Sequence, residues 1–81
     1  MKLVPFELVV MMEECGELVR ACSKIIRHGT DDEKYRQNLI DEMGDVQAMI
    51  SLVSKEYNIS DKELMKATDK RILKMKRSDY E

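Results

Sequence analysis

The chain has 81 residues, a formal net charge of −2 at pH 7, one proline and three glycines. At this length we expect one domain, residues 1–81, near the lower limit at which a chain buries a self-sufficient core. Two cysteines and one histidine argue against a disulfide framework or a structural zinc site. The abundance of Glu, Lys, Leu, Met and Ile predicts an all-α fold.

The two cysteines, Cys15 and Cys22, lie seven residues apart. On a helix this spacing is ~10 Å along the axis, whereas a disulfide needs Cα atoms within about 7 Å. We therefore expect two thiols buried as small apolar residues in a reducing compartment. No signal peptide or membrane-spanning stretch is visible, which favours a cytoplasmic protein.

The first predicted helix follows Pro5, a residue that suits the first turn. We expect it to end at His28, with Gly29 as its C-terminal cap and Arg27 near the negative end of the helix dipole. Its apolar residues recur at helical spacing: Leu8, Met11, Met12, Cys15, Leu18, Val19, Cys22, Ile25 and Ile26.

The second predicted helix covers residues 31–57 and begins with a capping box formed by Thr30 and Glu33. It has two apolar sides and therefore needs two partners. The main stripe consists of Leu39, Ile40, Met43, Val46, Ile50, Val53 and Tyr57. A second set, pointing away from that stripe, consists of Ala48, Met49 and Leu52.

The third predicted helix covers residues 61–77 and begins with a capping box of Ser60 and Glu63. Its residues expected to point inward are Leu64, Met65, Thr68, Ile72 and Met75. The chain is thus predicted to be three helices in up-down-up order. Because helix two has apolar surface to spare, we expect a homodimer or homotetramer that completes a helical bundle core.

Two pairs of acids, each spaced three residues apart, lie on the first two helices: Glu14 with Glu17, and Glu42 with Asp45. Such spacing places each pair on one helix face, and antiparallel helices would bring the pairs together. At an effective dielectric near 20, like charges ~5 Å apart cost ~3 kcal/mol per contact. Four converging carboxylates therefore require a cation, and hard oxygen ligands favour Mg²⁺.

A basic stripe follows on the third helix, where Lys66, Lys70, Lys74 and Arg77 are spaced i, i+4, i+8 and i+11. Acidic pairs that hold a cation beside such a stripe suit a nucleoside polyphosphate. The same stripe also fits the solvated outer face of an amphipathic helix.

Together these residues resemble the MazG-type all-α nucleoside triphosphate pyrophosphohydrolases. Their signature, Glu-Glu-x-x-Glu followed by Glu-x-x-Asp, appears as Glu-Glu-Cys-Gly-Glu at residues 13–17 and Glu-Met-Gly-Asp at residues 42–45. The family's C-terminal pattern of Ala, Lys, an apolar residue and Arg is matched by Ala67, Lys74, Met75 and Arg77. The resemblance covers residues 8–77.

The resemblance implies cleavage of the α–β phosphate bond of a nucleotide to a monophosphate and pyrophosphate, as in the removal of damaged or surplus nucleotides. It assigns the metal, Mg²⁺ with Mn²⁺ as a substitute, to Glu14, Glu17, Glu42 and Asp45. Glu13 would orient or deprotonate the attacking water. The implied substrate contacts are Asn38, Lys70, Lys74 and Arg77.

One departure from the family concerns the wall that grips the base. Many relatives have a further helix before the first acidic motif, whereas this chain starts close to that motif and has no Trp. A neighbouring subunit, or the linker with Arg27, His28 and Tyr35, would then supply the wall.

Two other classes of function remain open. A non-catalytic helical module for oligomerisation or nucleotide sensing would keep the bundle alone. A nucleic-acid binder would use the third helix and bind with strong salt dependence; the overall acidity argues against it.

Overall fold

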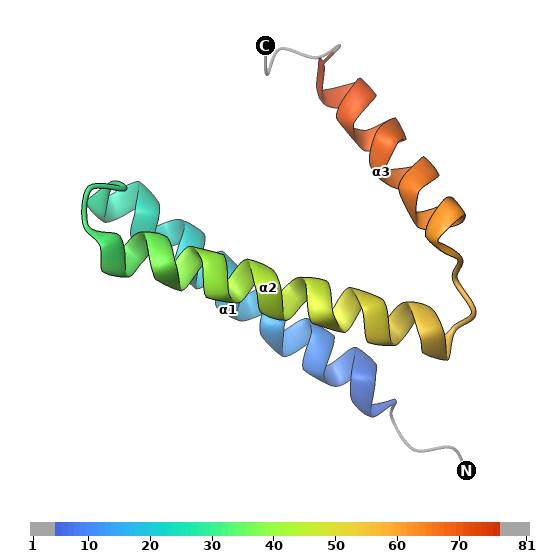
Figure 1. Cartoon of the computed structure of the whole chain (residues 1–81). Helices are drawn as coiled ribbons and strands as arrows, with labels where there is room; N and C mark the ends of the chain where they lie inside the picture. The colour runs from blue at the N-terminus through green and yellow to red at the C-terminus, as the bar shows by residue number, and fades with distance from the viewer. Residues whose placement is uncertain (1–4, 77–81) are drawn as a thin grey trace.

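The computed structural model describes residues 5–76, and three helices make up most of them. These are α1 (Phe6–His28), α2 (Glu33–Glu56) and α3 (Asp61–Lys76). The described residues contain no strand, so the predicted all-α fold is confirmed. α1 and α2 lie antiparallel as a hairpin, and α3 leads away from it (Figure 1).

The core of the hairpin is small. Among the described residues only Ala21, Met49 and Val53 are buried, with 1%, 8% and 9% of their surface exposed. Met49 belongs to the set expected to point away from the main stripe of α2, whereas Met43 of that stripe is 51% exposed. The face of α2 that meets α1 therefore runs between the two predicted apolar sets.

The turn between α1 and α2 begins as the sequence predicts. α1 ends at His28, and Gly29 adopts a φ of 78°, a left-handed conformation that favours glycine. The Gly29 N–H donates to the Ile25 carbonyl at 2.7 Å. Across the turn, the His28 and Tyr35 rings stack with centroids 4.4 Å apart. This stack ties the end of α1 to the start of α2.

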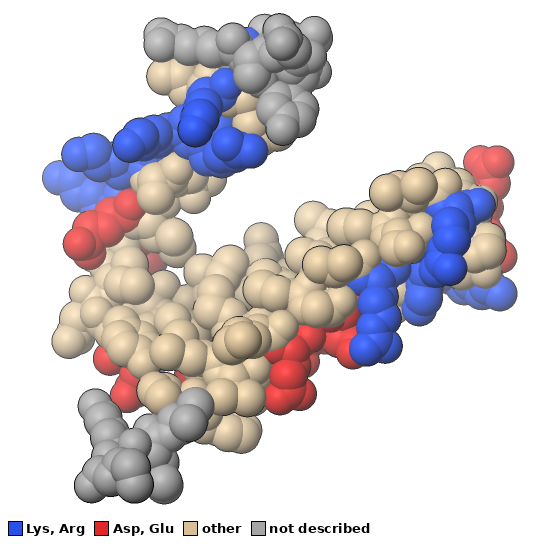
Figure 2. All heavy atoms as spheres, turned by 180° about the vertical axis from the view of Figure 1, so that it is seen from behind, with Lys and Arg blue, Asp and Glu red and all other residues tan. Residues whose placement is uncertain are grey.

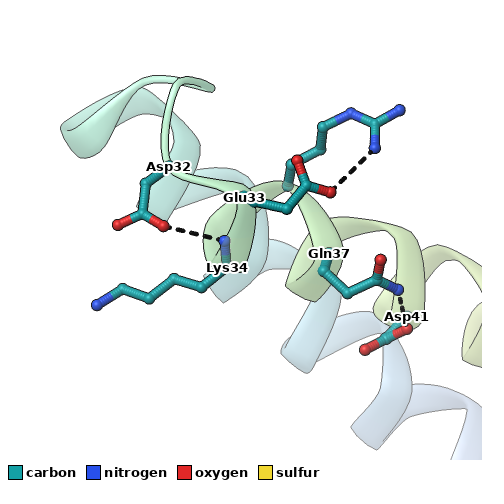
Figure 3. Close-up of polar contacts among 6 residues, drawn as sticks. Asp32, Glu33, Lys34, Gln37 and Asp41 are labelled. Carbon is teal, nitrogen blue, oxygen red and sulfur yellow. Dashed lines mark hydrogen bonds and ion pairs between the residues drawn. The ribbon is translucent and has the colours of Figure 1, made fainter.

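The start of α2 differs from the predicted capping box of Thr30 and Glu33. The helix begins at Glu33, and the preceding Asp32 is the cap: its Oδ1 accepts from the Lys34 N–H at 3.0 Å (Figure 3). Glu33 instead pairs with Arg36 at 3.4 Å. The prediction was wrong because Asp32 is itself a strong N-cap residue placed closer to the helix.

The turn between α2 and α3 is fixed by several hydrogen bonds. Asn58 adopts a φ of 55°, and the Ile59 N–H donates to the Ser54 carbonyl at 2.8 Å, as in a Schellman motif. Ser60 Oγ then accepts from the Glu63 N–H at 3.1 Å, while Glu63 accepts from the Ser60 N–H at 2.8 Å. The predicted Ser60–Glu63 capping box is confirmed.

α3 packs against neither of the other helices in this chain. No Cα atom of α3 lies within 8 Å of one in α1 or α2 in the part of the chain that the structure describes. The residues expected to point inward keep wide contact with solvent, and Met65 and Ile72 are 63% and 47% exposed. The Cα radius of gyration is 15.5 Å, against ~12 Å for a compact chain of this length.

The prediction that Cys15 and Cys22 are buried was wrong for the single chain. Both are exposed, although both are free thiols as expected. They lie on a part of α1 that α2 does not cover, together with Val19, which is 67% exposed. Apolar periodicity identified an apolar face of α1, but it did not show that α2 leaves this part of the face uncovered.

Candidate metal centre between α1 and α2

Helical spacing on α1 and α2 places four polar residues on the surfaces where the two helices meet. Glu14 and Glu17 precede the buried Ala21 by seven and four residues, on the same side of α1. Glu42 and Asp45 precede the buried Met49 in the same way on α2. The two acids of each pair therefore lie about two turns and about one turn along the seam from a core residue. Figure 2 shows a patch of Asp and Glu midway along the hairpin.

Three of the four predicted metal ligands come together. Glu14, Glu42 and Asp45 each offer one carboxylate oxygen, and these oxygens all lie within 4.8 Å of one another. Glu14 and Glu42 are half-buried, whereas Asp45 is exposed. The cluster is therefore open to solvent on one side and supported by the helix seam on the other.

The electrostatics of the cluster reflect its crowding. Partial burial raises the pKa of Glu14, and the negative charges of Asp45 and Glu42 add to this effect. Partial burial likewise raises the pKa of Glu42, followed by the charges of Asp45 and Glu17. Like charges so close together favour the protonated form unless a cation compensates them.

The donor set fits a hard divalent cation. All three groups are carboxylates, which suit Mg²⁺ or Mn²⁺ rather than a metal that prefers thiolates. Opposite ligands of an octahedral Mg²⁺ lie ~4.2 Å apart, because each Mg–O distance is about 2.1 Å. The three oxygens lie within 4.8 Å of one another, which is close to this distance. Three protein oxygens would also leave ligand positions for water and a phosphate.

The fourth predicted ligand, Glu17, lies beside the cluster rather than in it. Its carboxylate pairs with Arg20 at 3.5 Å, and the two side chains are 46% and 72% exposed. Its charge still contributes to the raised pKa of Glu14 and of Glu42. An exposed ion pair of this kind contributes little free energy, so it is a weak competitor for Glu17.

Two further predicted residues lie on the hairpin. Glu13 is exposed and is not one of the three grouped carboxylates. Asn38 is half-buried, one turn before Glu42, and its Oδ1 is buried with no hydrogen-bond partner among the described residues. A buried polar atom without a hydrogen-bond partner lowers the stability of the fold, so this oxygen is a candidate contact for a bound molecule.

One charged residue near the cluster was not singled out from the sequence. Lys24 is half-buried on α1, and its positive charge lowers the pKa of Glu42, against the other influences on that group. The signal that could have found it is its spacing of seven residues from Glu17, which places both on one side of α1.

The predicted phosphate-binding residues are not brought to the cluster within this chain. Lys70 and Lys74 are exposed on α3, which leads away from the hairpin (Figure 1). Arg77 lies outside the described residues.

No helix in the described part of the chain combines the length and apolarity needed to cross a bilayer.

No solved structure matches the chain. Among curated proteins, an uncharacterized protein YvdC from Bacillus subtilis (strain 168) is 38% identical over 71 residues, which cover 79% of this chain and 67% of that protein. A family model described as the MazG nucleotide pyrophosphohydrolase domain matches residues 7–79. The chain therefore belongs to the MazG nucleotide pyrophosphohydrolase domain family.

Proposed function

We propose that this chain is a Mg²⁺-dependent nucleoside triphosphate pyrophosphohydrolase. The observation that carries the proposal is the group of Glu14, Glu42 and Asp45, whose oxygens from two helices converge within 4.8 Å. Water would add to the α–β phosphoanhydride, the bond to the bridging oxygen would break, and a monophosphate and pyrophosphate would leave. Modified or surplus nucleotides are the proposed physiological substrates.

The metal would be held by the three grouped carboxylates together with Glu17, once that residue leaves Arg20. When bound, Mg²⁺ neutralises phosphate charge and lowers the pKa of water. Mn²⁺, which takes the same oxygen ligands, would substitute.

The other residues would act on the water and the substrate. Glu13 would orient the attacking water and accept its proton. Asn38 would contact the substrate through its side-chain amide, whose Oδ1 has no hydrogen-bond partner among the described residues. Lys70, Lys74 and Arg77 would neutralise the phosphates. These roles, and assembly into a homodimer or homotetramer, rest on the family and on the placement of residues along the helices.

The test is incubation with a panel of ribo- and deoxyribonucleoside triphosphates, with Mg²⁺, Mn²⁺ or excess chelator, and measurement of both products. We expect equal amounts of monophosphate and pyrophosphate with either metal and none with chelator. Release of inorganic phosphate instead would contradict cleavage at the α–β bond. Binding of nucleotides without turnover would favour the nucleotide-sensing module.

A further inference from the structure

The acidic cluster and the cations expected to work with it lie on parts of the chain that do not meet. The carboxylates occupy the middle of the α1–α2 hairpin, whereas Lys and Arg gather on α3 (Figure 2). No Cα atom of α3 lies within 8 Å of the hairpin helices among the described residues. A nucleotide at the cluster of one chain would therefore not reach the basic residues of α3 in the same chain.

The turn before α3 opposes a simple return of this helix onto its own hairpin. Asn58 is in the left-handed region, Ile59 donates to Ser54, and Ser60 and Glu63 cap each other. A change of direction at this turn would break several of these hydrogen bonds, each worth about 1 kcal/mol. The direction of α3 is thus a built feature of the chain.

The exposed surface is larger than that of a compact monomer of this mass. Its accessible surface is 7152 Å², whereas a compact monomer of 9.5 kDa is expected to expose about 5000 Å². An excess of roughly 2000 Å² per chain matches what the interfaces of obligate dimers bury. Only three described residues are buried within the chain, a core too small for an independent bundle.

The positions of the charged residues around α3 show which of them border its apolar face. At ~100° per residue, the apolar face is centred on Leu64, Ile72 and Met75. Arg71 lies seven residues after Leu64 and four before Met75, at one edge of this face. Lys74 lies three residues after Arg71, on the same flank. A helix docked through its apolar face would thus direct these two cations along the surface that it covers.

We propose that α3 of a second copy of this chain docks beside the hairpin of the first and brings Arg71 and Lys74 to the phosphates of a nucleotide held at the acidic cluster. Each site then combines the carboxylates of one chain with the cations of another. The acidic patch midway along the hairpin and the basic residues of α3 are complementary in charge, which supports this pairing (Figure 2). The inference rests on the proposed function and adds a partner and Arg71 to it.

Complementation between two inactive variants tests the proposal. Glu14→Gln removes a carboxylate, and the double variant Arg71→Ala/Lys74→Ala removes both cations; we expect each alone to lose at least ~100-fold in kcat/KM. Co-refolding equal amounts should restore about a quarter of wild-type activity in a dimer, because half of the dimers are mixed and each has one intact site. Activity equal to the sum of the two variants would overturn the proposal.

A matched control changes two cations on the opposite flank of α3. Lys62→Ala/Lys76→Ala removes the same charge away from the edge that carries Arg71. We expect this variant to keep wild-type kcat/KM within about twofold. Loss of activity in this control as large as in Arg71→Ala/Lys74→Ala would show that net charge alone matters, and would contradict the assignment.

Cross-linking separates failure of this proposal from failure of the proposed function. In a background with Cys15→Ser and Cys22→Ser, one chain carries Asp41→Cys, next to Glu42, and a longer tagged chain carries Arg71→Cys. A short bis-maleimide should give a mixed dimer of distinct size. Its formation without nucleotide turnover would sustain the composite arrangement and defeat the enzyme; turnover without a mixed dimer would do the reverse.

Discussion

The α1–α2 hairpin and α3 differ in how much they bury and in the charge that they carry. The hairpin buries a small core and gathers Glu14, Glu42 and Asp45 beside it. α3 buries no described residue and carries mostly cations on its surface. Repulsion on the hairpin is tolerated because core contacts hold the helices together, whereas the described residues of α3 contribute no buried side chain. The difference separates a part with a core of its own from a part without one.

The largest expected effect is on the hairpin. Glu14→Gln removes one of the three grouped oxygens, and we expect kcat to fall by at least ~100-fold, because metal ligation supplies several kcal/mol of transition-state stabilisation. Steady-state kinetics and far-UV circular dichroism would show lost activity with unchanged helix content. Glu56→Gln, exposed at the end of α2, is the control. Full activity of the Glu14 variant would show that the cluster is not the metal site.

A second prediction concerns the contact between the two helices. Ala21 is 1% exposed, and Ala21→Leu would force the helices apart, with an expected loss of ~1–3 kcal/mol in the free energy of unfolding. Chemical denaturation measures this loss. Ala48→Leu adds the same side chain at an exposed position of α2 and should change stability by less than ~0.5 kcal/mol. Equal effects would mean that the seam is not closely packed.

The capping of α3 gives a smaller effect. Ser60→Ala removes the hydroxyl that accepts from the Glu63 N–H, and we expect a loss of about 1 kcal/mol. Amide hydrogen exchange should show faster exchange in the first turn of α3 and no change in the hairpin. Ser51→Ala, exposed within α2, is the matched control. Faster exchange in both regions would contradict the independence of α3 from the hairpin.

The smallest expected effect is a difference between the hairpin and α3 in how stability depends on pH. The pKa of Glu14 and Glu42 is raised above the ordinary value of 4.5, so the folded metal-free chain binds protons that the unfolded chain does not. Its stability should therefore increase as the pH falls from neutrality through the raised pKa values towards 4.5. Thermal melts in chelator would show this rise, and Glu14→Gln/Glu42→Gln should abolish it.

α3 should respond to pH with the opposite sign. Hydrogen bonds from Ser60 lower the pKa of Glu63, so its contribution is present above 4.5 and is lost as the pH falls through the folded pKa. With added Mg²⁺, the stability of the hairpin should instead decrease as the pH falls, because protons then compete with the metal for the carboxylates. A metal-free hairpin whose stability falls between neutral pH and 4.5 would contradict the raised pKa values.

Local signals in the sequence were sufficient for the helices and for the three carboxylates that the structure groups. Gly29 and the Ser60–Glu63 pair marked helix ends that the structure confirms. The three-residue spacing of the acids also placed Glu14, Glu42 and Asp45 in one group. These features depend on neighbours along the helix and on one antiparallel contact, and periodicity captures both.

Other features depend on distant parts of the fold and could not be read in the same way. Apolar spacing grouped Leu64 with Ile72, but it does not say whether the surface that covers them belongs to the same chain. The same limit explains why the predicted burial of Cys15 was wrong, since this residue is exposed in the structure. At the start of α2, Thr30 and Asp32 both satisfy the rules for an N-cap, and only the geometry of the turn distinguished them.

The stacked rings of His28 and Tyr35 have a consequence for the spacing of the chain. They clamp the hairpin at its tip, roughly 16 Å along α1 from Glu17 at 1.5 Å per residue. An extra residue within α1 between Glu17 and His28 would move Glu17 by 1.5 Å along the helix axis and ~100° around it, relative to this clamp. The acids of α1 would then no longer face those of α2, so the number of helical residues between the clamp and the acids sets the alignment of the acidic cluster.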